Sequence, residues 1–257
     1  YEMKECDWSS DVCSSDLPLL PHQGAHVAHH PGAAGGAPVN TETAGTMLTL
    51  RESTASHHRR AEQHEFQQQF VRGTLPRPLY LHWLAQLLHI HAALEAHLDR
   101  LVTRNPQLKT VFDDGRRKVG PLRKDLAYLG ASADEPALPA ALALVARMDR
   151  LASEQPMALL GILYVLEGST NGSKFIARKV RPAYELPVTG EGSAYLDPYG
   201  DVQPARWQEF KAAMDALNLP AADVAPMVVA AQETFDSIRE LGAELLASPA
   251  ATGSTGR

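Results

Sequence analysis

Residues 164–180 read YVLEGSTNGSKFIARKV. Leucine and isoleucine recur at helical spacing from 159 to 176, which predicts a helix that begins at Pro156 and includes this stretch. Gly168 and Gly172 lie inside it, although each glycine costs a helix roughly 1 kcal/mol relative to alanine. The two glycines are one turn apart and face the same way. Either another helix packs closely against them, or a flat ligand lies on the backbone where a Cβ would collide with it.

The segment 56–75, SHHRRAEQHEFQQQFVRGTL, carries a second pattern. His58 and Glu62 are four residues apart, so on a helix the carboxylate can accept a hydrogen bond from the ring of a metal-binding histidine. Phe66 and Phe70 continue the same face and could support a flat apolar cofactor. The chain contains 11 histidines, and the spacing alone leaves open that His58 is an ordinary surface residue.

Together the two stretches resemble the heme oxygenase family. The residues that carry the resemblance are His58, Ala61, Glu62, Phe66, Phe70, Gly73, Tyr80, the run LLHIHAALEAHLDR at 87–100 and the glycine-bearing stretch. The bacterial, phytochrome-associated branch is the most similar, because its distal helix typically carries EGS followed by a further glycine. The resemblance covers about Met47 to Leu246. It implies an all-α, single-domain, multi-helix bundle in which heme lies between a proximal and a distal helix.

The resemblance also implies an activity, the O₂-dependent opening of heme to biliverdin, CO and ferrous iron, with heme as both substrate and cofactor. By the same resemblance His58 is the proximal ligand of the heme iron, and Glu62 fixes the orientation of its ring. His57 is the fallback ligand, although it points about 100° away around the helix.

On the distal side, the resemblance assigns the catalytic surface to Gly168, Ser169 and Gly172. Ser169 stands where many animal-type members of the family carry an aspartate that orders a water, and the bacterial branch often has serine there. Asn171 and Ser173 depart from the apolar and glycine residues that are common at these points. A bulkier, more polar helix could narrow the pocket, which leaves open a heme-binding or heme-delivery protein without turnover.

Heme propionates require cations, and the residues that match the family's basic positions are Arg51, Lys211 and, more weakly, Arg178. Tyr164, one turn before Gly168, could reach a propionate or a distal water network. The alternative for each basic residue is a solvated side chain without a ligand.

A third hypothesis is a non-heme di-iron oxidase on the same scaffold. Its candidate ligands are His91, Glu95 and Glu167, but the recurring Glu/Asp-xxx-His sets of such sites are missing. His91 and Glu95 border an apolar stripe, which favours a hydrogen bond at the edge of the core over a metal pair. No flavin or nicotinamide motif is present, so the electrons for a heme oxygenase would come from an external donor, a ferredoxin, a flavodoxin or an NAD(P)H reductase.

Composition narrows the remaining function classes. The net charge of −6, a pI near 6.0 and scattered basic residues argue against a nucleic-acid-binding surface. No run of about 18 apolar residues predicts a membrane span, so we expect a soluble, cytoplasmic, bacterial protein. Residues 1–46 resemble a translated sequencing adapter and are excluded from the fold, with a natural start expected at Met47. Both cysteines, Cys6 and Cys13, lie in this leader.

We therefore expect a single domain over 47–247, followed by a disordered tail over 248–257. A capping box at Thr49 and Glu52 predicts a first helix that runs to about Val71, where Gly73 ends it. Further helices are expected over 78–101, 121–130, 139–153, 204–217 and 221–246, with an irregular loop over 181–203. No segment alternates with period two for long enough to predict a strand, so the predicted fold is all-α.

Overall fold

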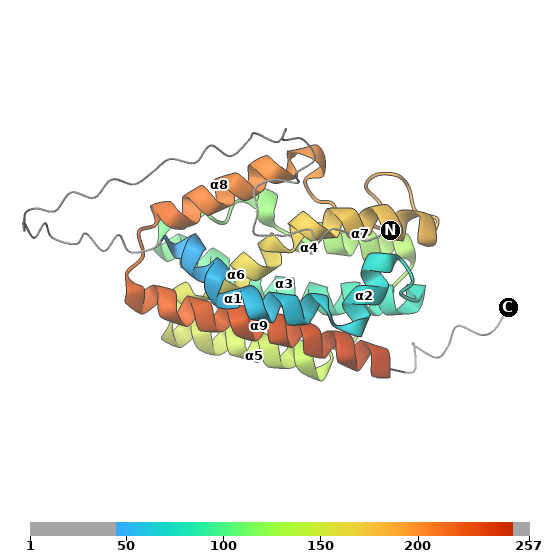
Figure 1. Ribbon diagram of the computed structural model, residues 1–257, viewed down its shortest axis with the longest axis horizontal. Helices are drawn as coiled ribbons and strands as arrows, with labels where there is room; N and C mark the ends of the chain where they lie inside the picture. The colour runs from blue at the N-terminus through green and yellow to red at the C-terminus, as the bar shows by residue number, and fades with distance from the viewer. Residues whose placement is uncertain (1–44, 249–257) are drawn as a thin grey trace, which may run out of the picture. The chain divides into compact units, whose positions relative to one another are not determined.

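The computed structural model describes residues 45–248, and all of the regular structure in this range is helical (Figure 1), which confirms the all-α prediction. The leader through residue 44, with both cysteines, and the tail from residue 249 lie outside the described residues. The α-helices are α1 Thr46–Glu62, α2 Glu65–Arg72, α3 Arg77–Arg104, α4 Val119–Leu129, α5 Pro139–Glu154, α6 Leu159–Gly168, α7 Thr170–Ala183, α8 Gln203–Ala216 and α9 Ala221–Ala247. Short 3-10 helices are η1 Pro106–Thr110, η2 Asp114–Arg116, η3 Pro156–Ala158 and η4 Gly200–Val202.

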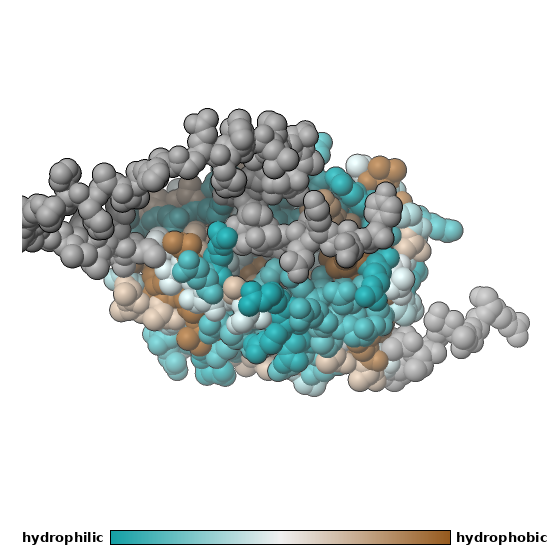
Figure 2. All heavy atoms as spheres, in the orientation of Figure 1, coloured by the Kyte–Doolittle hydropathy of each residue, from teal (hydrophilic) through white to brown (hydrophobic). Residues whose placement is uncertain are grey.

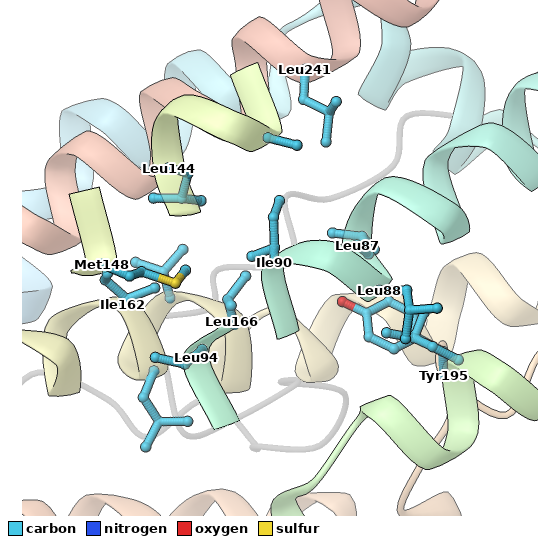
Figure 3. Close-up of a cluster of buried hydrophobic side chains, with 14 of the residues drawn as sticks. Leu87, Leu88, Ile90, Leu94, Leu144, Met148, Ile162, Leu166, Tyr195 and Leu241 are labelled. Atoms are coloured by element: carbon cyan, nitrogen blue, oxygen red, sulfur yellow. The ribbon is translucent and has the colours of Figure 1, made fainter. Parts of the chain in front are cut away.

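The long helix α3 forms the centre of the core, as its three-and-four leucine spacing predicts. It packs against α4, α5, α6 and α9. Figure 3 shows side chains of α3 facing those of α5, α6 and α9, and the labelled members of this cluster are Leu87, Leu88, Ile90, Leu94, Leu144, Met148, Ile162, Leu166, Tyr195 and Leu241. Each buried leucine or isoleucine contributes about 1.5–3 kcal/mol. Hydrophilic residues gather on the face shown in Figure 2, over α1 and α2. Within residues 45–248, no helix is both long and apolar enough to cross a membrane.

Helices α6 and α9 cross at Gly161, in backbone contact. A Cβ at Gly161 would overlap the carbonyl oxygen of Met227 and lie 2.9 Å from its carbonyl carbon. Real Cβ atoms do not come this close to backbone atoms, so the crossing requires a residue without a side chain. The sequence analysis considered close helix packing for Gly168 and Gly172, whereas the position that demands it is Gly161.

The first helix begins earlier than the capping box predicts. Gly45 is the N-cap of α1, Thr46 is its first residue, and the amide of Met47 donates to Asp215 Oδ1 of α8 at 2.9 Å. The first turn is thus stabilised by a carboxylate from a distant helix, whereas the sequence predicted that the Thr49 side chain caps the helix. The expected domain start at Met47 lies one residue inside the helix.

The expectation of a continuous helix to Val71 is also wrong, because the chain turns after Glu62. His64 is the N-cap of α2, with its Nδ1 accepting from the Phe66 amide at 3.4 Å. The turn buries Phe66 and Phe70 among the rings of Tyr80 and Trp83 rather than leaving them beside His58 as a support for a cofactor. Gly73 ends α2 in the left-handed region at φ 70°, as predicted.

The glycine-bearing helix is likewise interrupted, at Ser169 between α6 and α7. Polar side chains beyond the break donate to carbonyl groups three residues back: Ser169 Oγ to Leu166 at 2.7 Å, Thr170 Oγ1 to Glu167 at 2.6 Å and Asn171 Nδ2 to Gly168 at 3.0 Å. Such bonds satisfy carbonyls near the break and commonly accompany a bend. The run of small polar residues thus has a local structural explanation.

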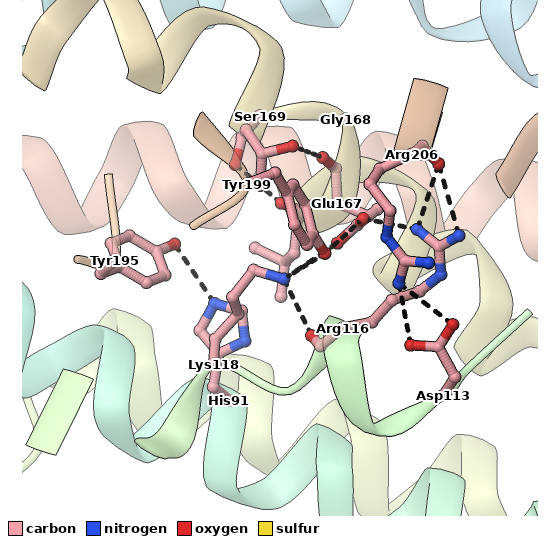
Figure 4. Close-up of polar contacts among 12 residues, drawn as sticks. His91, Asp113, Arg116, Lys118, Glu167, Gly168, Ser169, Tyr195, Tyr199 and Arg206 are labelled. Carbon is pink, nitrogen blue, oxygen red and sulfur yellow. Dashed lines mark hydrogen bonds and ion pairs between the residues drawn. The ribbon is translucent and has the colours of Figure 1, made fainter. Parts of the chain in front are cut away.

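The segment after α7 begins at Tyr184 rather than at Arg181, and buried polar groups fix its course. Asp125 of α4 accepts from the amides of Ala194 at 2.9 Å and Tyr195 at 2.8 Å, and the Tyr80 hydroxyl donates to Gly192 O at 2.8 Å. Tyr195 and Tyr199 of this segment lie next to the break between α6 and α7 (Figure 4).

Candidate functional site

His58 and Glu62 form the pair that the sequence predicts on the last turns of α1. His58 Nδ1 lies 3.4 Å from Glu62 Oε2, and the imidazole is about one quarter exposed (23%). The Phe235 ring of α9 packs against the His58 ring in a T-shaped arrangement with 5.4 Å between the centroids. The carboxylate and the aromatic ring therefore both orient the imidazole. His57 instead lies 3.7 Å from Asp236 of α9.

Two contacts join the α1–α2 segment to the α6–α7 segment. Tyr164 of α6 lies close to Thr54 of α1, and at the other end Gly73 lies against Lys179 of α7, where a Cβ would be 3.1 Å from the Lys179 Cβ. His58 follows Thr54 by one turn, and Gly168 follows Tyr164 by one turn. His58 therefore lies between Thr54 and Gly73 on one segment, and Gly168 and Gly172 lie between Tyr164 and Lys179 on the other.

Gly168 faces Trp207 of α8, but this packing does not require a glycine. A Cβ at Gly168 would lie 3.4 Å from the nearest carbon of the Trp207 ring, which is an ordinary contact distance. Trp207 also lies 6.2 Å from the Tyr164 ring and stacks on Phe210 at 5.4 Å between centroids. The close-packing explanation is thus weaker at Gly168 than at Gly161.

Ser169 lies close to Tyr195, which in turn contacts His91. The Ser169 hydroxyl donates to the Leu166 carbonyl at 2.7 Å, and His91 Nε2 lies within hydrogen-bonding distance of the Tyr195 hydroxyl, 3.2 Å away. Burial lowers the pKa of His91 to about 3, with the charge of Lys118 acting in the same direction, so the ring is neutral. Ser169 could accept a further hydrogen bond, but to donate one it would have to release Leu166.

Asn171 and Ser173, the two departures from the family pattern, have partners within the protein. Asn171 Oδ1 accepts from Gln203 Nε2 of α8 at 3.1 Å. Ser173 is buried and donates to Leu196 O at 2.6 Å. Their polar groups are thus directed toward α8 and the 184–199 segment, which weakens the argument that they narrow a pocket.

The three basic residues predicted to bind the heme propionates lie on three different helices, α1, α8 and α7. Arg51 is close enough to Tyr164 for its charge to lower the pKa of that hydroxyl, although burial, the larger effect, raises it. Lys211 lies on α8, which packs against α1. Arg178 is on the exposed face of α7 with its guanidinium 5.4 Å from the centroid of the Phe175 ring. Arg51 and Lys211 thus lie on two helices that pack against each other.

The candidate ligands of the di-iron hypothesis do not converge. His91 contacts Tyr195, and Glu95 accepts from the amides of Lys118 at 2.6 Å and Val119 at 3.0 Å at the start of α4. Glu167 pairs with Arg116 and Lys118. Among the described residues, no three histidine, cysteine or acidic side chains are grouped to bind a metal ion. The sequence contained these residues but gave no signal for their partners, which lie about 25–100 positions away.

Comparison with known proteins identifies the family of this chain. The family model described as "Heme oxygenase" matches residues 46–244. The chain belongs to the heme oxygenase family. Among curated relatives, heme oxygenase 1 of Rattus norvegicus is 27% identical over 175 residues, which is 66% of this chain and 61% of the rat protein. Heme oxygenase 2 of Mus musculus is 26% identical over 211 residues, 80% of this chain and 67% of the mouse protein. The chain thus spans about two thirds of the length of these relatives.

Solved heme oxygenases share the fold. The cyanobacterial heme oxygenase-1 from Synechocystis, solved in complex with heme, superimposes with a TM-score of 0.71 at 22% identity over 78% of this chain and 92% of that one. The heme oxygenase from Leptospira interrogans gives 0.70 at 21% identity over 78% and 99% of the two chains. The predicted heme-oxygenase-like bundle is therefore confirmed.

The neutral state of His91 predicts a specific pH dependence of stability. The unfolded chain protonates this residue near pH 6.5, whereas the folded protein does so only near pH 3, so the free energy of unfolding falls as the pH drops from 6.5 toward 3. At pH 4.5 the loss from this residue is about 2–3 kcal/mol. Urea unfolding at pH 7 and 4.5 measures it. His91→Gln, which can still donate to Tyr195, is expected to flatten the difference, and an unchanged difference would contradict the assignment.

Proposed function

We propose that this protein opens heme with O₂ and externally supplied electrons, releasing biliverdin, CO and ferrous iron. The observation that carries the proposal is the His58–Glu62 pair, with Nδ1 and Oε2 3.4 Å apart, on the opposite segment from Gly168 and Gly172 and between the same two inter-helix contacts. A histidine oriented by a carboxylate suits axial ligation of iron, and glycines suit close approach of a flat macrocycle.

The residues of this chain divide the work of binding. His58 would hold the iron, and Glu62 would keep its ring in the required tautomer. Arg51 on α1 and Lys211 on α8, two helices that pack against each other, suit the two propionates, while Arg178 on the exposed face of α7 is a weaker candidate. Bound heme supplies both the iron that activates O₂ and the carbon that is oxidised.

On the distal side the chain offers backbone and hydroxyl groups in place of an acid. Gly168 and Gly172 would allow close approach, and Ser169 would accept a hydrogen bond from an ordered water without donating a proton. A site without a strong acid favours attack on the macrocycle over early O–O cleavage. Electrons would come from a ferredoxin, a flavodoxin or an NAD(P)H-dependent reductase.

The test is a hemin titration of the full chain followed in the Soret region, then addition of ascorbate or a reductase under air. Loss of a stoichiometric Soret band with growth of a biliverdin band is the expected result. A Soret band that survives reductant and O₂ would instead indicate a heme-binding protein without turnover. Failure to bind hemin would exclude both functions.

Glu62→Ala is expected to weaken hemin affinity or turnover about 10–100-fold, because loss of an orienting carboxylate typically costs this much at histidine metal sites. Glu62→Gln retains an acceptor oxygen and should lose less. Hemin titration and the initial rate of biliverdin formation measure both variants. Glu52→Ala, an exposed glutamate of the same helix, is the matched control, and an equal loss there would refute the orienting role.

A further inference from the structure

Next to the break between α6 and α7 lies a buried ionic cluster that has no assigned role in the proposed reaction. Glu167 accepts from Arg116 Nη1 at 2.7 Å, from Lys118 Nζ at 3.1 Å and from the Tyr199 hydroxyl at 2.7 Å (Figure 4). The side chains of Glu167, Arg116 and Lys118 are each no more than 2% exposed. We call Arg116, Lys118, Glu167 and Tyr199 the Glu167 cluster.

Stability alone is a poor explanation for the Glu167 cluster. Removing ions from water costs several kcal/mol each, and replacing a buried ion pair with apolar residues of similar volume is often neutral or stabilising. The cluster also leaves Arg116 Nε buried without a hydrogen-bond partner among the described residues, which adds to the cost. What such a cluster provides is a unique geometry, because Glu167 is held by three donors from three different residues of the chain.

The Glu167 cluster holds the two helix positions that meet at Gly168, one on α6 and one on α8. Glu167 precedes Gly168 in the chain, and Arg206 precedes Trp207. Arg116 joins these two places, because its guanidinium donates both to Glu167 and to the backbone carbonyl of Arg206, at 3.3–3.4 Å. Arg206 is held in addition by Asp113 at 2.9 and 3.0 Å. Gly168 and Trp207 are thus each the chain neighbour of a residue that Arg116 binds, so Arg116 fixes the contact between them.

We propose that the Glu167 cluster is a positioning device, which fixes the distance between the Gly168 backbone and Trp207 and thereby selects which meso carbon of bound heme is oxidised. Glu167, Arg116 and Lys118 act as positioning residues through Gly168 and Trp207. This inference rests on the proposed heme oxygenase function, since it concerns the seating of the same substrate. In this role Glu167 binds the side-chain cations of Arg116 and Lys118 and not a metal ion.

Glu167→Gln tests the inference, because it keeps the shape and removes the charge that holds two cations. Glu95→Gln is the matched control: Glu95 is also a buried carboxylate, but it holds the first amides of α4. In Glu167→Gln we expect a mixture of biliverdin isomers where the wild type forms one dominant isomer, together with a shifted and broadened C–O stretch of the ferrous CO complex. Glu95→Gln should retain the wild-type isomer and stretch.

A measurement on the heme-free protein separates this inference from the proposed function. Hydrogen exchange of peptides covering 165–173 and 203–210 is expected to accelerate about tenfold in Glu167→Gln and not in Glu95→Gln. If the wild type fails to turn over heme but this acceleration occurs, the proposed function fails and the positioning of Gly168 and Trp207 stands. Wild-type exchange, isomer and C–O stretch in Glu167→Gln would overturn the inference.

A second variant covers the case in which Glu167→Gln does not fold. The triple substitution Arg116→Met, Lys118→Met and Glu167→Met removes the buried charges together and is expected to unfold at the wild-type urea concentration or higher. If the Glu167 cluster positions the distal helix, this stable variant still gives mixed isomers and faster exchange. If it behaves as the wild type in both, the cluster has no positioning role.

Discussion

Replacement of His58 by alanine is expected to abolish the wild-type Soret spectrum and to lower heme turnover by more than about 100-fold, because the iron loses its only protein ligand in the proposed arrangement. The protein should remain folded, since the imidazole is partly exposed and lies on the last turns of α1, outside the hydrophobic core. Hemin titration and the rate of biliverdin formation measure the two effects.

Added imidazole distinguishes a ligand from a structural residue. If His58 supplies only a nitrogen to iron, free imidazole should restore much of the Soret spectrum in His58→Ala. The control is His57→Ala, which removes the neighbouring histidine and its contact with Asp236 and is expected to bind and turn over heme as the wild type does. Loss of activity in His57→Ala with retention in His58→Ala would reverse the assignment.

Sequence periodicity was sufficient to predict the long helices, because their apolar spacing reports directly which face is buried. It failed at the ends and breaks, where the deciding partner is distant in sequence. Asp215 satisfies the start of α1, and Gly242 of α9 leaves room for the Phe66 side chain after the turn that follows Glu62. Local capping rules do not include such partners.

The candidate site also contains residues whose partners are near in sequence, which could be predicted, and residues whose partners are distant, which could not. His58 and Glu62 could be paired from sequence because their contact is local to one helix turn. The Glu167 cluster could not, because Glu167 meets cations 49 and 51 positions away, and a carboxylate between leucine and glycine has no distinguishing pattern. Trp207 lies within the predicted helix over 204–217, but its contact with Gly168 depends on how α8 packs beside α6.

Gly161→Ala is expected to destabilise the protein by about 3 kcal/mol or more, although alanine favours a helix by roughly 1 kcal/mol over glycine. The added Cβ would overlap the Met227 carbonyl oxygen, and backbone cannot move aside as a flexible side chain can. Helices α6 and α9 would have to separate, which disturbs the core around Ile162. At about 2–4 °C per kcal/mol for a domain of this size, Tm should fall by roughly 6–12 °C.

Gly168→Ala is the informative partner of this variant, because the same change two turns later meets only the Trp207 ring at 3.4 Å. Its urea midpoint and Tm should equal or exceed the wild-type values, owing to the gain in helix propensity. If bound heme lies against this backbone and Trp207, hemin affinity should nevertheless fall, since the added methyl group presses on the Trp207 ring beside the substrate. Lower stability with unchanged hemin affinity at Gly168 would mean that both glycines serve helix packing, and the distal assignment would then have to move to Gly172.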